Sequence, residues 1–189
     1  MIRYIKDGKA VPTTLVDLAA SVRIIAQMGS VKGDTLPELY RLLRGTPGRT
    51  SGPAAFYKCR AADVTDLLTL HVRTGEMRIM CREGDDESKV ELAFVLANSQ
   101  SELPPVDQEL TIRIQSCMGS QPDLRRLLTV ANIVKSLRED GGEEFDLSAL
   151  GAALNELIAS RKLAMVVAEP SSAEDVQLFL KCPEFSWQQ

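Results

Sequence analysis

Apolar residues at three- and four-residue intervals predict two helices in the N-terminal part of the chain. Residues 14–28 begin with a capping-box pair, Thr14 and Asp17, and continue with apolar side chains at helical spacing: Leu15, Leu18, Val22 and Ile25. A second start signal follows, with Thr35 as the cap, Pro37 in the first turn and Glu38 at the capping-box position. We therefore expect a helix over residues 14–28 and a second helix that ends at Gly45.

A tight hairpin is predicted in the middle of the chain. Residues 66–73 and 76–82 flank Thr74 and Gly75, and this two-residue spacing is typical of such a turn. One face of the second strand carries apolar side chains: Met77, Ile79 and Cys81. A further strand is expected over residues 89–97.

Two other segments also have strand-like patterns. Residues 2–5 are short and β-prone, which predicts an edge strand at the N-terminus. Residues 109–116 alternate between apolar and polar positions, with Leu110, Ile112 and Ile114 expected to point inward. Such alternation is typical of an antiparallel sheet with one covered face.

The C-terminal part predicts two helices and a hairpin. Ser120 caps a helix that carries Leu124, Leu127, Leu128, Ala131 and Val134 and stops at Gly141. Asp146 caps a second helix over residues 147–162, whose apolar stripe is Leu147, Leu150, Leu154, Leu157 and Ile158. Residues 163–168 and 175–181 then form the closing hairpin.

Together these elements predict an α+β fold in a single domain over residues 1–189. The expected architecture is an antiparallel sheet covered by helices, with two N-terminal helices, a C-terminal helical pair and a closing hairpin. A chain of 189 residues, 44% of them apolar, is long enough to bury one such core. Residues 45–56 interrupt the pattern, because three glycines and two prolines fall within the first ten of them. We expect a mobile loop there.

The sequence predicts a cytoplasmic protein. The longest apolar runs, residues 92–97 and 163–168, are far shorter than the ~20 residues that a transmembrane helix needs. The first residues lack the apolar stretch of a secretory signal. Four cysteines are scattered without a Cys-x-x-Cys pair, so we interpret them as reduced core residues and not as metal ligands: Cys59, Cys81, Cys117 and Cys182.

Charge is distributed unevenly along the chain. Residues 1–60 contain ten basic and four acidic side chains, an excess of six positive charges. Because the whole chain has a net charge of −4, the remaining residues carry an excess of ten negative charges. A basic end on an acidic body favours contact with phosphates or anionic lipid head groups. An ordinary solvated surface whose halves differ by chance is the alternative.

No catalytic constellation is evident in the sequence. His71 is the single histidine, and in a strand-like segment it is interpreted as a packed or surface side chain. The acidic run from Asp85 to Glu87 is interpreted as a solvated turn. Motifs for a nucleophilic serine, a zinc protease or a phosphate-binding loop are missing. We therefore expect a protein that is not an enzyme, with no cofactor, no metal and no small-molecule substrate.

Residues 120–181 allow a more specific hypothesis. Two helices followed by a hairpin is the order of a winged helix, which places a helix in a DNA groove. The charges oppose this reading, because the helix over residues 147–162 has its cations, Arg161 and Lys162, at its very end. A winged-helix regulator remains one alternative. An acidic adaptor that resembles a secretion chaperone is another.

The order of elements resembles the matrix protein of rhabdoviruses, especially the vesiculovirus type. The likeness rests on residues 14–22, Thr-Leu-Val-Asp-Leu-Ala-Ala-Ser-Val, on residues 39–43, Leu-Tyr-Arg-Leu-Leu, and on residues 109–114, Glu-Leu-Thr-Ile-Arg-Ile. Residues 145–162 and the final hairpin match in order and apolar placement. The chain departs from the family in lacking a Lys-rich N-terminal segment and a Pro-Pro-x-Tyr motif, which favours a plant-infecting member.

This resemblance implies a viral structural protein that self-associates and bridges the nucleocapsid and the membrane during virion assembly. Its implied partners are further copies of itself, the viral nucleocapsid and an anionic membrane surface that it contacts peripherally. Its implied location is the virion and the host cytoplasm. Arg3, Lys6 and Lys9 stand in for the family's basic segment. Residues 45–56 stand in for its self-association loop, with the candidate residues Pro47, Arg49, Pro53, Ala55 and Phe56.

Overall fold

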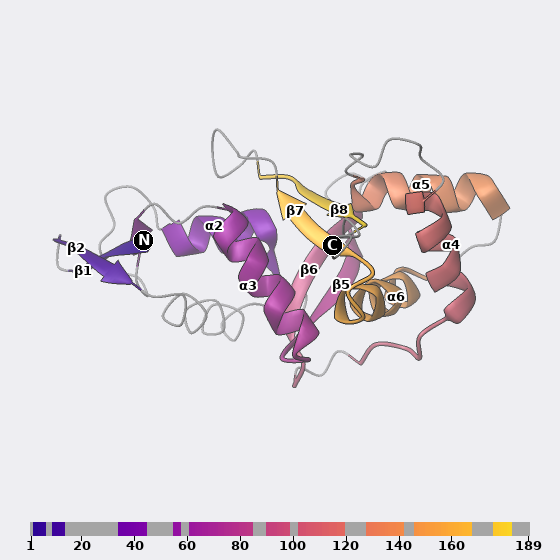
Figure 1. The fold of residues 1–189 in the computed structure, drawn as a ribbon, viewed down its shortest axis with the longest axis horizontal. Coiled ribbons are helices and arrows are strands. Elements are labelled where there is room, and N and C mark those ends of the chain that lie inside the picture. The colour runs from indigo at the N-terminus through magenta and orange to yellow at the C-terminus, as the bar shows by residue number, and fades with distance from the viewer. Residues whose placement is uncertain are drawn as a thin grey trace, which may run out of the picture.

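The computed structural model describes ten segments of the chain: residues 2–6, 9–13, 34–44, 55–57, 61–84, 90–98, 102–119, 128–141, 146–167 and 176–182. Within them, helices and antiparallel strands are combined in an α+β fold, which confirms the predicted class (Figure 1). No helix in these segments is both long enough and apolar enough to cross a bilayer.

The centre of the fold is a sheet with the strand order β3-β6-β5. β5 (Met77–Glu83) and β6 (Val90–Leu96) pair along their whole length, whereas β3 (Asp34–Thr35) pairs only with Phe94 and Ala93. In β5 the side chains of Met77, Ile79 and Cys81 are buried in alternation with more exposed ones. This confirms the predicted face of that strand.

Helix α6 (Leu147–Ala159) seals the outer edge of β5. The side-chain amide of Asn155 donates to the carbonyl of Ile79 at 2.7 Å, and its Oδ1 accepts from the Ile79 amide at 2.9 Å. The same nitrogen donates to the carbonyl of Gly151 at 2.7 Å. A Cβ atom on Gly151 would lie only 3.2 Å from the Ile79 carbonyl oxygen, so glycine allows the close approach. Asn155 thus occupies the place of a neighbouring strand.

The other helices pack around this centre. α3 (Ala61–Arg73) contacts β5, α6 and β7, whereas α4 (Gln108–Gly119) packs on α5 (Val130–Gly141) and α6. β7 (Ala164–Val167) and β8 (Leu178–Lys181) form the predicted closing hairpin. Leucine and isoleucine side chains from α3 to α6 fill the core, among them Leu68, Ile114, Ile133, Leu137, Leu154 and Leu157.

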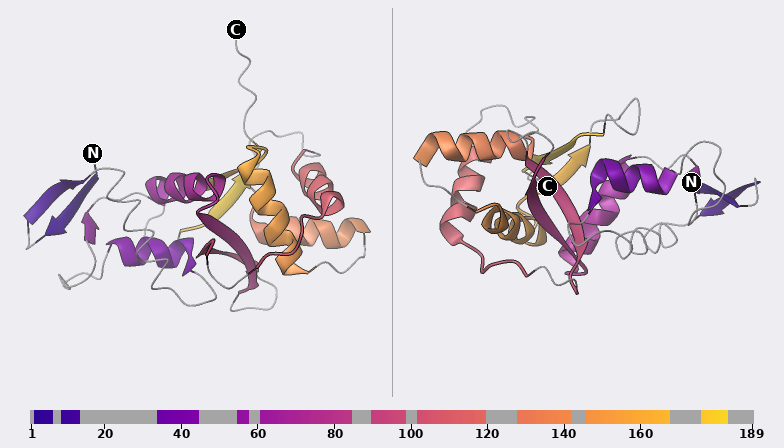
Figure 2. Two further views of the ribbon diagram at one scale, coloured as in Figure 1. Left: turned by 90° about the horizontal axis from the view of Figure 1, so that it is seen from below. Right: turned by 180° about the vertical axis from the view of Figure 1, so that it is seen from behind.

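A third sheet lies at the end of the molecule opposite α4 and α5 (Figures 1 and 2). Its strand order is β2-β1-β4, formed by β1 (Ile2–Lys6), β2 (Lys9–Thr13) and β4 (Ala55–Tyr57). α2 (Leu36–Arg44) contacts β4 and links this sheet to the rest of the fold. β1 confirms a strand over residues 2–5, but it pairs with β2 on one side and β4 on the other, so it is not the predicted edge strand.

Residues 66–73 are helical, so the predicted first strand of the hairpin is wrong. They belong to α3, in which Val64, Leu67, Leu68, His71 and Val72 are buried at helical spacing. Gly75, with φ of +74°, turns the chain from α3 into β5. The turn at Thr74 and Gly75 was therefore identified correctly, but it joins a helix to a strand.

Residues 109–116 also belong to a helix, α4, and not to the predicted strand. The carboxylate of Asp107 accepts from the amides of Glu109 and Leu110 at 2.9 and 3.2 Å and so caps the helix. Leu110 and Ile114 are buried as expected, but Ile112 is 61% exposed. The alternating pattern was misread because two of its three apolar positions also fit one helical face.

The C-terminal helices differ from the prediction mainly at their ends. α5 begins at Val130. Leu128, which was predicted to lie inside this helix, instead forms a β-bridge with Leu180. Asp146 caps α6 as predicted, but the helix ends at Ala159, and Arg161 has a φ of 61°.

The predicted helix that begins after Thr35 is confirmed as α2, and the predicted strand over residues 89–97 is confirmed as β6. The helix predicted over residues 14–28, and the part of the predicted loop before Ala55, lie outside the described residues. Ala55 and Phe56 are in β4, so the end of the predicted mobile loop is a strand.

We expect Asn155→Ala to lower the free energy of unfolding by about 2–4 kcal/mol, because it leaves the Ile79 amide and carbonyl without a partner. Urea unfolding followed by circular dichroism measures this change. The matched control is Glu156→Ala at the exposed neighbouring position, which should change stability by no more than about 0.5 kcal/mol. Equal effects of the two substitutions would contradict the role assigned to Asn155.

Candidate functional site

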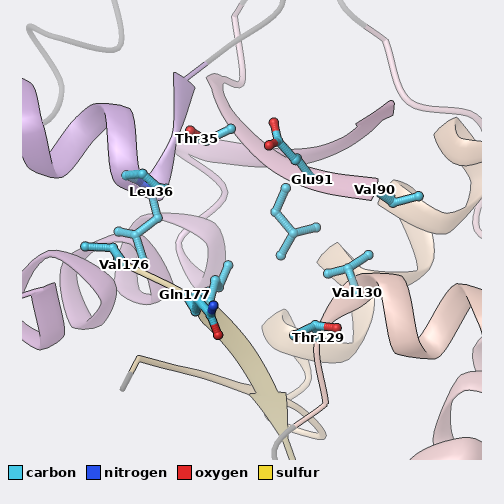
Figure 3. A pocket seen from close by; sticks show the side chains of 11 residues that line it. Thr35, Leu36, Val90, Glu91, Thr129, Val130, Val176 and Gln177 are labelled. Carbon is cyan, nitrogen blue, oxygen red and sulfur yellow. The ribbon is translucent and has the colours of Figure 1, made fainter. Parts of the chain in front are cut away.

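An apolar pocket of about 200 Å³ lies where four elements meet (Figure 3). The start of α2, the beginning of β6, the start of α5 and the residues leading into β8 form its walls. Most of the lining side chains are apolar: Leu36, Pro37, Val90, Leu92, Val130, Val176 and Leu178. Polar groups are supplied by Thr35, Glu91, Thr129 and Gln177.

The pocket exists because β3 is short. After Thr35 the chain turns into α2 and leaves β6, so no β3 residue lies opposite Leu92. The capping box fixes this turn, since Glu38 Oε2 accepts from the Thr35 amide at 2.7 Å and from its hydroxyl at 2.8 Å. Pro37 in the first helical turn provides no amide with which to continue the strand pairing.

The opposite wall is held by a second set of contacts. Leu128 and Leu180 exchange two backbone hydrogen bonds, of 3.1 and 2.8 Å. Directly after this bridge, Thr129 Oγ1 accepts from the Asn132 amide at 3.2 Å at the start of α5. The bridge therefore ties β8 to α5 at the pocket wall.

One guanidinium and two carboxylates lie beside the pocket. Arg82 Nη2 is 3.2 Å from Glu38 Oε2, and Arg82 Nε is 3.6 Å from Glu91 Oε2. The side chains of Glu38 and Glu91 are 40% and 41% exposed, respectively. Burial raises the pKa of Glu38, but hydrogen bonds from Thr35 and the nearby charge of Arg82 outweigh this effect, so the pKa is lowered overall. The three groups together carry one net negative charge.

Two groups with possible chemical reactivity, Cys81 and His71, are buried. Burial raises the pKa of Cys81 to about 12, which keeps the thiol protonated and therefore poorly nucleophilic. His71 lies on α3 and not on the predicted strand; it is buried, and its Nδ1 is 2.7 Å from Glu76 Oε2. Within the described segments, no three metal-ligating side chains come together.

The structure brings together two of the segments predicted to carry function. Arg3 and Lys6 lie in β1 and Lys9 lies in β2, with Lys6 directly opposite Lys9 and Arg3 opposite Pro12. Ala55 and Phe56 lie in β4, which pairs with the other side of β1. Pro47, Arg49 and Pro53 lie outside the described residues.

The sequence did not predict the pocket. Its walls come from residues between 35 and 178, and only the packing of the whole fold brings them together. One local signal was present, because the Thr35-Leu36-Pro37-Glu38 start signal implies that a strand before it must end there.

Comparison of this chain with models of protein families, with curated proteins and with solved structures gives no match.

We expect acid to destabilise the protein partly through Glu38. Its lowered pKa in the folded protein means that its contribution to stability is complete above the ordinary glutamate pKa and is lost as pH falls through the folded-state value. Glu38→Gln retains a side chain suited to the capping box but cannot titrate. Its unfolding free energy, measured in urea between about pH 6 and pH 3, should therefore fall less than that of the wild type. Parallel pH profiles would contradict this assignment.

Proposed function

We propose that this protein is a non-enzymatic structural protein of the viral matrix type. In this proposal it self-associates, attaches through its basic N-terminal sheet to anionic surfaces, and bridges nucleocapsid and membrane during virion assembly. The likeness of residues 14–22 and 39–43 to rhabdovirus matrix proteins motivates the proposal. The strand register of the N-terminal sheet is the observation that supports it most directly.

In that register, Lys6 and Lys9 are directly opposite each other. Like charges at opposite positions of an antiparallel pair are destabilising, and a bound anion relieves this cost. Arg3 is in the same pair of strands, opposite Pro12. Three cations thus occupy one short hairpin at the end of the molecule (Figure 1).

The charge distribution along the chain favours one orientation of the molecule on an anionic surface. It belongs to the segment with an excess of six positive charges, whereas the residues after position 60 carry an excess of ten negative charges. An anionic surface therefore attracts one end of the molecule and repels the other. Such polarity favours an oriented attachment.

The packing of α6 counts against the alternative of a winged-helix regulator. In that reading, α6 is the helix that enters the DNA groove. Here Leu150, Leu154, Leu157 and Ile158 are buried, and Asn155 is bonded to β5. Most of α6 is therefore packed against the core of the protein, where it cannot enter a DNA groove.

We expect the protein to float with vesicles that contain phosphatidylserine and not with vesicles of phosphatidylcholine alone. The double substitution Lys6→Glu and Lys9→Glu should weaken binding on the order of 10-fold or more, because each cation near an anionic surface contributes about 1 kcal/mol. Vesicle flotation with quantification of the bound fraction measures the effect.

The matched control is Lys135→Glu with Lys162→Glu, which changes the net charge equally at two exposed positions outside the N-terminal sheet. This control should bind like the wild type. Equal weakening by both double substitutions would show that net charge and not the hairpin determines attachment, and would refute the assigned surface.

Self-association should also depend on salt. We expect the molar mass from light scattering to rise with protein concentration at low ionic strength and to fall towards the monomer mass at about 0.5 M salt. Arg49→Glu should reduce the association at low salt, whereas Lys162→Glu should leave it unchanged. A mass of 20.7 kDa at every concentration and salt level would remove self-association from the proposal.

A further inference from the structure

We propose that one face of the N-terminal sheet docks on membranes by binding the phosphomonoester head group of a lipid such as phosphatidic acid. This face is defined by Tyr4, Lys6, Lys9, Val11 and Phe56, and we call it the Tyr4 face. The inference rests on the proposed function, because it takes attachment of this sheet to an anionic surface as its starting point. It adds which face makes the contact and which head group that face selects.

The strand register determines which residues share the Tyr4 face. Alternate residues of a strand belong to the same face of a sheet, so Tyr4 and Lys6 of β1 lie together. Residues directly opposite each other on neighbouring strands share a face as well. Lys9 is directly opposite Lys6. Val11 of β2 and Phe56 of β4 are both opposite Tyr4. The face therefore has an apolar row across three strands, with two lysine positions beside it.

The lysine pair favours one group with two negative charges over a group with one. In a directly opposite pair such as Lys6 and Lys9, the Cα atoms are no more than about 5.5 Å apart. A phosphomonoester carries a charge of about −1.5 to −2 near neutral pH and has three strong acceptor oxygens, so a single head group can accept from both ammonium groups. A lipid whose phosphate is a diester, such as phosphatidylserine, offers less charge to the pair. We therefore expect the face to discriminate between these head groups.

The apolar row beside the lysines favours a lipid over a soluble phosphate. Tyr4 has Val11 on one side and Phe56 on the other. Aromatic residues are enriched at the depth of lipid head groups, where an apolar ring meets water. Apolar residues next to cations are also typical of protein surfaces that lie in the membrane interface. This row thus matches a phosphate that has acyl chains beneath it.

The other face of the sheet has a different composition. Its residues in the three strands are Arg3, Ile5, Ala10, Pro12, Ala55 and Tyr57. Arg3 is the one cation of this face in the described strands, and it is opposite Pro12 and Tyr57. No second cation is therefore opposite it to share a doubly charged group. This face provides matched control positions in the same strands.

Flotation of the full chain with matched vesicles tests the choice of head group. Phosphatidylcholine vesicles contain either phosphatidic acid or phosphatidylserine, in amounts that give equal electrophoretic mobility. We expect binding to phosphatidic acid to be tighter by about 5-fold or more. Glycerol 3-phosphate at about 1 mM should not release the protein, because a soluble phosphate leaves the apolar row without acyl chains.

Substitutions at adjacent positions on opposite faces locate the contact. Phe56→Ala should weaken binding to phosphatidic acid about 5-fold or more, whereas Tyr57→Ala should not. Lys9→Gln should remove the preference for phosphatidic acid, whereas Arg3→Gln should lower binding to both anionic lipids to the same degree. Urea unfolding of each variant separates loss of binding from loss of the fold.

Four results overturn this inference and leave the attachment of the N-terminal sheet intact. They are equal binding to the two anionic vesicles, equal effects of Phe56→Ala and Tyr57→Ala in folded variants, a preference that survives Lys9→Gln, and release by glycerol 3-phosphate. Failure to bind either anionic vesicle refutes the proposed function itself, and this inference with it.

Discussion

The contact between α6 and the outer edge of β5 is the constraint on which the rest of the fold depends. A central sheet with a free edge invites pairing with other chains, and here one helix closes that edge with the side chain of Asn155. Gly151 one turn earlier favours this approach, because a Cβ atom there would lie 3.2 Å from the Ile79 carbonyl oxygen. α3, α4 and β5 all contact α6, so a shift of this helix would disturb each of these contacts.

The closing of the β5 edge by α6 also distinguishes the two edges of the central sheet. At the other edge of the sheet, β3 pairs with Ala93 and Phe94 of β6. A small apolar pocket lies beyond the end of β3, whereas the N-terminal hairpin lies at a distant end of the molecule. The apolar pocket and the basic hairpin are therefore separate parts of the surface.

Elements with explicit end signals were predictable from the sequence, whereas ambiguous apolar patterns were not. Thr35 with Glu38 identified α2, and Asp146 identified α6. Residues 109–116 were assigned to a strand because Leu110, Ile112 and Ile114 alternate, although Asp107 offered a helix cap just before them. The pocket was not predictable from the sequence. Strand register and helix packing bring Glu91 and Gln177 to one cavity, and local sequence patterns determine neither of them. For the basic residues the sequence identified the side chains, and the register then showed that Lys6 and Lys9 are opposite each other.

Pro12 in β2 has a consequence for how copies of this chain can meet. In a hairpin with two residues between Lys6 and Lys9, that pair is hydrogen-bonded, so the alternate residues Ala10 and Pro12 direct their backbone groups outward. Proline has no amide hydrogen to offer there. An incoming strand would therefore find an incomplete template along β2, and fibrils built by continuous stacking of this sheet are disfavoured.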